Sequence, residues 1–209
     1  MTMSTNVRES AARGSLIELM YRRRSVRAYT AATIDETRLG VLLDAAVRAP
    51  TAMHEEPWRF IVVQNRAVLA RLSDRAKAMA RAEAARHGNV LKQPGSPGDG
   101  LASPFADPAF NIFYDAGTLV VIGANPTGEF IAADCWLAAE NLMLAACAEG
   151  LGSCCIGFAL KALNEPDTKA ELGIPEDIHA FAAIIVGVPT QDVPATPRKP
   201  AIMLSWIRS

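Results

Sequence analysis

Residues 22–27 read RRRSVR, which crowds four arginines and a serine into six positions where a helical pattern gives way to an extended one. A guanidinium is always charged and carries a planar fork of donors that fits a phosphate bidentately. On an extended backbone, Ser25 and Arg27 project to the same face. The segment therefore indicates either a solvated helix end or half of a binding site for a phosphate-bearing ligand.

The overall composition makes this arginine cluster a local feature. Of the 209 residues, 50% are hydrophobic and 21% are charged, and the formal net charge is −1. This ordinary globular balance provides no overall basic field that would recruit nucleic acid or an anionic membrane surface. We expect a single domain over residues 15–209, preceded by a flexible N-terminal segment over residues 1–14 that lacks the apolar stretch of a signal peptide.

The cysteine and histidine spacings predict no metal site and no disulfide framework. None of the four cysteines belongs to a CxxC pair, and the three histidines lie far apart in the sequence. No apolar run reaches the roughly 18 residues that span a bilayer. These observations predict a protein of the reducing cytoplasm without a membrane partner.

Hydrophobic periodicity predicts an α+β fold, because helices and strands mix without a strict βαβ alternation. The helix that ends before Pro50 begins with a capping box at Thr33. The last predicted helix is apolar on almost every side, so it must be buried in the core or at a subunit interface. Helices are expected at 15–23, 33–49, 69–87 and 130–149, and strands at 60–64, 118–122 and 184–186.

Two segments lack this regularity. Residues 88–108 are rich in Gly, Pro, Ser and Asp, and we expect an active-site flap there, with disorder as the alternative. Residues 190–209 form a C-terminal extension in which prolines precede an apolar tail at 202–207.

The glycine-rich stretch GLGSCCIG, residues 150–157, follows the apolar helix as a tight turn. Its spacing differs from GxGxxG, it does not follow a strand, and the chain has no GxxxxGK[ST] motif. These differences argue against a Rossmann-type nicotinamide domain and against a P-loop. Gly150 fits a helix C-cap, and the rest of the turn can offer backbone N–H groups to a flat ligand. Packing explains the adjacent Cys154 and Cys155 better than a strained vicinal disulfide does.

Four motifs together resemble the nitroreductase family of FMN-dependent oxidoreductases. They span nearly the whole chain in the family's order, and their combination is specific although each is weak singly. The resemblance implies an α+β fold with a central, mostly antiparallel sheet flanked by helices, in an intertwined homodimer with FMN sites at the subunit interface. The motifs are RRSVR at 23–27, APT at 49–51 leading to PWRF at 57–60, GLGSCCIG at 150–157, and GVP at 187–189 followed by RKP at 198–200.

The resemblance also implies roles for individual residues. Arg23 and Ser25 would hold the FMN phosphate, and Arg198 would close on it from far along the chain. Arg27 would lie near the pyrimidine edge of the flavin, where a cation favours the anionic reduced form. The turn after the apolar helix would pass N5 of the flavin, and the loop before PWRF would serve the partner subunit's side of the site. The implied FMN contacts are Arg23, Arg24, Ser25, Arg27, Pro50, Thr51, Ala52, His54, Cys155, Ile156, Gly157 and Arg198.

The chain departs from the family at residues 53–56. They read MHEE, where relatives often carry Asn and Gln before the Pro-Trp pair. Two carboxylates here either alter the electrostatics near the site or point to solvent.

The activity implied by the resemblance is reduction of FMN by NADH or NADPH, followed by electron transfer to a nitroaromatic, a quinone or a similar small acceptor in a ping-pong scheme. No Ser-His-Asp or Cys-His arrangement is visible, so no catalytic side chain is predicted and the cofactor carries the chemistry. Three alternatives stay open: a specialised relative that dehalogenates, oxidises or fragments its ligand, a non-catalytic flavin-binding or sensing protein, and a surface-basic domain without a cofactor.

Overall fold

A four-stranded sheet forms the centre of the protein in the computed structural model, which describes residues 15–87 and 104–208. Neighbouring strands are antiparallel throughout, and the inner strands β2 and β4 are almost entirely buried because both of their faces are covered. The α+β expectation with a central antiparallel sheet is confirmed. In spatial order the strands are β1 (Arg59–Val63), β2 (Thr118–Ala124), β4 (His179–Gly187) and β3 (Gly152–Cys155).

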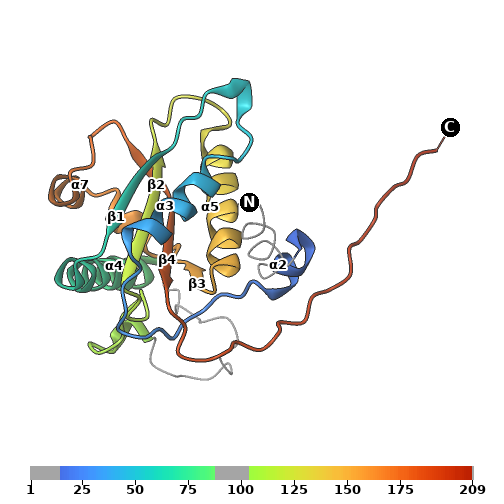
Figure 1. Cartoon of the computed structure of the whole chain (residues 1–209). Coiled ribbons are helices and arrows are strands. Elements are labelled where there is room, and N and C mark those ends of the chain that lie inside the picture. The colour runs from blue at the N-terminus through green and yellow to red at the C-terminus, as the bar shows by residue number, and fades with distance from the viewer. Residues whose placement is uncertain (1–14, 88–103, 209) are drawn as a thin grey trace, which may run out of the picture.

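Helices cover both faces of this sheet (Figure 1). Successive residues of a strand point to opposite faces, so Leu119 and Val121 pack toward α4 and α6, whereas Val120 and Ile122 pack toward α3 and α5. The helices are α2 (Leu16–Arg22), α3 (Glu36–Ala46), α4 (Arg66–His87), α5 (Ile131–Ala148), α6 (Ala159–Leu163) and α7 (Pro166–Leu172), with short 3-10 turns η1 (Ala52–His54) and η2 (Pro104–Ala106).

The start of α3 and the end of α5 can be compared with the capping residues that the sequence predicted. The expected capping box at Thr33 is wrong: Asp35 is the N-cap of α3, and its carboxylate accepts from the Arg38 N–H at 2.8 Å. Gly150 caps α5 as expected, with φ of +70°, and the Leu151 N–H donates to the Ala146 carbonyl at 2.8 Å as in a Schellman motif. Helix α3 therefore begins two residues later than the capping box at Thr33 predicts, after the Asp35 side chain that caps it.

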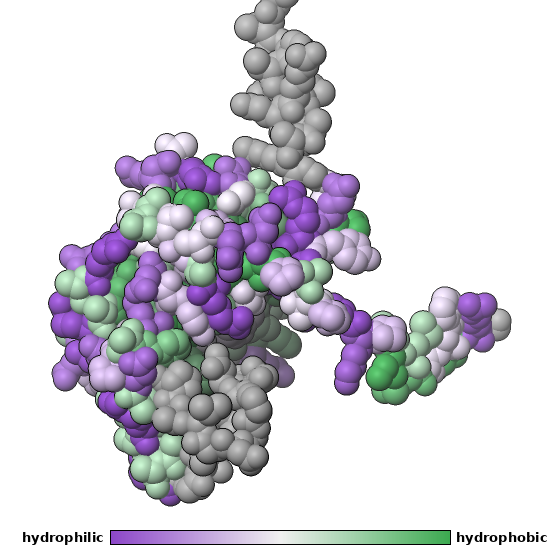
Figure 2. All heavy atoms as spheres, turned by 90° about the horizontal axis from the view of Figure 1, so that it is seen from below, coloured by the Kyte–Doolittle hydropathy of each residue, from purple (hydrophilic) through white to green (hydrophobic). Residues whose placement is uncertain are grey.

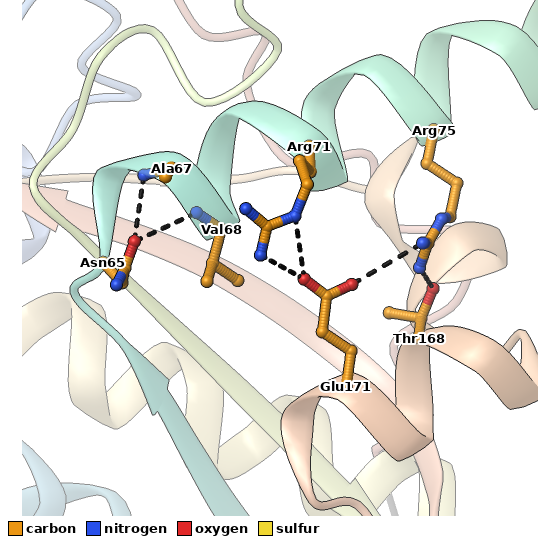
Figure 3. A network of polar contacts seen from close by, with 7 residues as sticks. All are labelled: Asn65, Ala67, Val68, Arg71, Arg75, Thr168 and Glu171. Carbon is orange, nitrogen blue, oxygen red and sulfur yellow. Dashed lines mark hydrogen bonds and ion pairs between the residues drawn. The ribbon is translucent and has the colours of Figure 1, made fainter.

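The structure adds a strand and two helices that periodicity missed. The glycine-rich stretch is not only a turn: Gly152–Cys155 forms the edge strand β3, paired with β4. Helix α7 is held to α4 by a charged network, in which Glu171 accepts from Arg71 Nε at 3.0 Å and lies 3.5 Å from Arg75 Nη2 (Figure 3). Arg75 also donates to the Thr168 hydroxyl, and Asn65 accepts from two N–H groups of the first turn of α4 at 3.0 and 3.1 Å (Figure 3).

Helix α5 is buried only on the side that faces the sheet. Cys135 and Leu142 are fully buried, whereas Trp136 and Leu137 are 40% and 45% exposed on the outer side. By length and composition alone this 18-residue helix, with a mean hydropathy of 1.3, could cross a membrane, contrary to the expectation that no apolar run is long enough. Half of it is buried inside the structure, which is typical of the core helix of a soluble protein.

The C-terminal extension leaves the body of the protein. Residues 190–208 contain no helix or strand, and the chain runs outward as an extended arm (Figure 1). Its apolar end is uncovered, with Leu204 95% and Ile207 93% exposed. The expectations for residues 1–14 and for a flap at 88–103 lie outside the described residues; within the rest of that predicted flap, Phe105 in η2 is buried.

Candidate functional site

The arginine segment lies against the outer edge of the sheet. After α2 ends at Arg22, the backbone becomes extended, and the Val26 N–H donates to the Ser153 carbonyl of β3 at 3.0 Å. Ser25 and Ser153 form a parallel bridge. Further along, the Thr30 N–H donates to the Val188 carbonyl just after β4 at 2.8 Å. The segment is thus fixed by backbone pairing to both β3 and the end of β4.

Two glycines make this close approach possible. Gly152 and Gly187 are partners in the β3–β4 register. A Cβ at Gly152 would lie 2.7 Å from the side chain of Val26, and one at Gly187 would lie 2.9 Å from the ring of Tyr29. Both side chains are buried, and the Tyr29 hydroxyl donates to the Val26 carbonyl at 2.8 Å. Val26 points inward, so its neighbours Ser25 and Arg27 lie exposed on either side of it, as alternation along an extended chain predicts.

The arginines of the segment take different directions. Arg22 is exposed at the end of α2, and Arg24 donates from Nη1 to the carbonyls of Tyr21 and Arg23, so its side chain serves the helix terminus. The Nε of Arg24 is buried and has no partner among the described residues. Arg23 is oriented differently: its Nε lies 3.5 Å from Glu140 Oε1 on α5. Neither terminal nitrogen of Arg23 forms a hydrogen bond with any part of the chain that the structure describes.

The turn from β3 into α6 lies beside this segment. Cys155 and Gly157 are exposed, and a Cβ on Gly157 would meet no atom within 4 Å in the described structure. The Ile156 N–H is already used, because it donates to the Ala183 carbonyl at 2.8 Å. Of the three predicted residues of this turn, Ile156 is buried and therefore structural. Cys155 and Gly157 present the open surface.

The thiols beside the arginines stay protonated at neutral pH. Burial raises the pKa of Cys154, and this effect exceeds the opposing influence of Arg27, of a hydrogen bond from Ser25 and of Arg23. Burial of the thiol also raises the pKa of Cys155 to about 11, with a smaller contribution from Cys154. The Cys155 sulfur lies 3.5 Å from Met143 Sδ, although the residue as a whole is exposed. Packing is therefore the role of these cysteines, as the sequence indicated.

Arg27 opens onto a separate cavity of ≈480 Å³. Its guanidinium carbon lies 5.9 Å from the centre of the Tyr114 ring, and Phe110 and Asn111 contribute to the same wall. Tyr114 has a positive φ of 51°, which turns the chain sharply at this wall. A cation next to aromatic rings suits a flat, electron-rich ligand.

The loop with the remaining predicted residues lies on another side of α5. Pro50 and His54 are exposed, Thr51 and Ala52 are half-buried, and the Ala52 N–H donates to Asp134 Oδ1 at 3.2 Å. Asp134 is six residues before Glu140, which places the two about 9 Å apart along the helix and about 120° apart around it. Arg198 is exposed on the C-terminal arm.

One chain therefore brings together only part of the predicted set. Arg23, Ser25, Arg27 and Cys155 share one region, as their mutual electrostatic effects on the thiols also show. Neither the loop around Ala52 nor Arg198 forms a hydrogen bond or an ion pair with that region within the described residues. Sequence reasoning missed Glu140; its signal was a charge in the middle of a largely apolar helix.

Comparison with known proteins identifies the family. The sequence profile of the Nitroreductase family matches residues 20–188. The chain belongs to the nitroreductase family. A relative from Archaeoglobus fulgidus, provisionally named NADH dehydrogenase/NAD(P)H nitroreductase, is 29% identical over 181 residues, which cover 84% of this chain and 86% of the relative. The resemblance inferred from the motifs is confirmed.

Solved structures of nitroreductases share the fold. The crystal structure of a nitroreductase with bound FMN from Bacteroides fragilis is 28% identical, with a TM-score of 0.74 over 94% of this chain and 100% of that chain. Iodotyrosine deiodinase bound to FMN and 3-iodo-L-tyrosine is 22% identical and has a TM-score of 0.69, over 90% of this chain and 97% of that chain. The same fold thus serves different reactions, and fold alone does not select the acceptor.

Proposed function

We propose that this nitroreductase-family protein is an FMN-dependent oxidoreductase that uses NADH or NADPH and reduces a nitroaromatic, a quinone or a similar small acceptor. The observation that carries the proposal is the arrangement of Arg23, Ser25 and Arg27 on one segment that pairs with β3, beside the open turn at Gly157. The bound FMN of the Bacteroides fragilis relative supports the choice of cofactor.

The residues on this edge fit FMN. A phosphate dianion needs cations and hydrogen-bond donors around it. Arg23, whose two terminal nitrogens have no hydrogen-bond partner among the described residues, lies two residues before the exposed Ser25. A flat ring system needs an open surface with small residues, and Gly157 provides one. Arg27 supplies a second cation. Ser25 and the buried Val26 separate it from Arg23 along the chain. The donor set matches a ligand with an anionic end and a planar end.

A bound FMN would supply the redox chemistry of both half-reactions, the transfer of electrons from NADH or NADPH to the acceptor. The chain's own residues would position the cofactor and the co-substrate and polarise the flavin. Arg27 would stabilise negative charge near the planar end of the ligand, which favours the reduced form. Phe110 and Tyr114 would bind an aromatic co-substrate by stacking. No cysteine serves as a nucleophile, since burial keeps the neighbouring thiols protonated.

We further infer a homodimer. The outer side of α5 exposes Trp136 and Leu137, α2 exposes Leu16 and Ile17 at 59% each, and the C-terminal arm ends in uncovered apolar side chains. Figure 2 shows this arm projecting from the body with a hydrophobic patch toward its end. Apolar surface of this extent is typical of a subunit interface. A second copy would add the loop around Ala52 and the arm with Arg198 to a site that one chain leaves incomplete.

The four free cysteines support a cytoplasmic location, where thiols stay reduced.

The proposal is tested on purified protein. We expect a yellow protein that releases FMN on denaturation and whose absorbance near 450 nm is bleached by NADH or NADPH under anaerobic conditions. A panel of nitroaromatics, quinones and halogenated aromatics, each read with and without oxygen, then identifies the acceptor class. Bound flavin that neither nicotinamide reduces would favour a non-catalytic flavin-binding protein, and a protein that neither contains nor binds FMN would contradict the proposal.

A further inference from the structure

A carboxylate on α5 lies beside the arginine that the proposed function assigns to the phosphate. Glu140 and Asn141 interrupt a run of apolar residues, between the fully buried Ala139 and Leu142. Its Oε1 is 3.5 Å from Arg23 Nε, and the side chains are 49% and 20% exposed. The ion pair therefore links the end of α2 to the middle of α5 at the edge of the protein, where a bound ligand can still reach the arginine.

The geometry of the pair leaves the arginine able to bind an anion. The contact uses Nε, and the two terminal nitrogens form no hydrogen bond within the described residues. Two parallel terminal N–H groups are one of the forks that bind a phosphate bidentately. The separation of 3.5 Å exceeds the roughly 2.7–2.9 Å of a full charge-assisted hydrogen bond, so Glu140 directs the guanidinium without saturating it.

Glu140 also lies near the turn at Cys155, which would hold the ring. Met143, one turn further along α5, contacts Cys155 with a sulfur–sulfur distance of 3.5 Å. The charge of Glu140 contributes to the raised pKa of the Cys155 thiol, and Arg23 opposes it. Glu140, Arg23 and Cys155 therefore lie within electrostatic range of one another.

We propose that Glu140 is a positioning residue for cofactor binding, which holds the Arg23 guanidinium through Nε so that both terminal nitrogens face the phosphate of the ligand. The inference rests on the proposed function, because it takes Arg23 as the phosphate-binding cation. An arginine that is already ordered loses less side-chain freedom when the ligand binds, so the carboxylate increases affinity although its own charge repels phosphate. If repulsion dominated, removing the carboxylate would tighten binding.

The comparison of FMN with riboflavin isolates this effect, because the two ligands differ only in the phosphate. Both are titrated into full-length protein freed of flavin, as wild type, E140A and E140Q. We expect E140A to weaken FMN binding about threefold to tenfold, the range of a partly exposed ion pair that orients one bidentate contact, with riboflavin affinity unchanged. E140Q keeps the length of the side chain and an amide oxygen for the place beside Nε, so it should remain within about twofold of wild type.

A matched control removes a carboxylate from another arginine Nε. Glu171 on α7 accepts from Arg71 Nε at 3.0 Å (Figure 3), and α7 lies on the opposite side of the molecule from α2 (Figure 1), so E171A should leave the FMN-to-riboflavin ratio unchanged. An unchanged ratio in E140A, or tighter FMN binding by both Glu140 variants, would overturn the role of Glu140 while leaving the proposed function intact. Wild-type protein that binds neither flavin would overturn both.

Discussion

Replacing Gly152 by alanine should push the arginine segment away from the sheet. A Cβ at this position would lie 2.7, 2.8 and 2.9 Å from the Cγ2, Cβ and Cγ1 atoms of Val26. Carbon atoms prefer about 3.5–4.0 Å, so the segment must retreat by several tenths of an ångström or more. Rotation of Val26 cannot relieve the contact, because its Cβ is itself too close and is fixed to the backbone.

The expected cost follows from two effects. Overpacking a well-packed core costs about 1–3 kcal/mol, and the retreat also weakens the hydrogen bond from Val26 to Ser153, worth about 1 kcal/mol. We expect G152A to lower the free energy of unfolding by about 2–3 kcal/mol, which corresponds to roughly 4–12 °C in Tm for a chain of this size. FMN affinity should fall about tenfold, because Arg23 and Ser25 move with the segment and a displacement of about 1 Å is costly at a binding site.

Denaturant unfolding and FMN titration provide the assay, with two further variants as controls. G40A introduces the same methyl group into α3, where a Cβ meets no atom within 4 Å, and should stabilise the protein by about 0.5–1 kcal/mol without changing FMN affinity. V26A/G152A removes two of the three close contacts, so it should be about 1 kcal/mol more stable than the sum of the single variants predicts. A G152A protein within about 0.5 kcal/mol of wild type, or strict additivity in the double variant, would refute this reasoning.

Three further predictions concern other parts of the molecule. R23A should lose FMN on gel filtration, whereas R22A, which removes an exposed charge at the end of α2, should retain it; equal retention by both would remove Arg23 from the site. Deleting residues 201–209 should shift the protein from dimer to monomer in light scattering, because it removes uncovered apolar side chains such as Leu204 and Ile207; an unchanged mass would exclude the arm from the interface. Burial raises the pKa of Cys135 from 9.0 to about 12. The stabilising effect of the buried thiol is therefore complete below about pH 9 and is lost as the pH rises toward 12. The free energy of unfolding should thus fall above about pH 9, and less steeply in C135A, by up to about 1.4 kcal/mol per pH unit; parallel curves would show that this thiol is not responsible.

Patterns within one segment predicted most of the fold. Strand β2, helix α5 and the glycine cap of α5 were predictable, because each depends on residues that are close together in the sequence. Strand β3 was not, because Gly, Ser and Cys have little strand preference and the strand exists through its pairing with β4. Helices α6 and α7 are short, and α7 depends on its charged contacts with α4.

The site was predictable in its residue types and less so in their directions. Alternation along the chain correctly placed Ser25 and Arg27 on one exposed face. The sequence did not show that Arg24 turns back to the α2 terminus, because this depends on the position of the helix carbonyls. The ion pair between Glu140 and Arg23 could not be predicted from the sequence, because the two residues are 117 positions apart and meet only when α2 packs on α5. Long-range docking of this kind leaves no periodic signal.

The absorption spectrum of the purified protein before and after anaerobic addition of NADH or NADPH tests the central claim most directly. We predict a flavin spectrum that is bleached by at least one nicotinamide and restored by a nitroaromatic or quinone, with one FMN released per chain on denaturation. A colourless protein that takes up no added FMN would contradict the assignment of the arginine segment as a cofactor site.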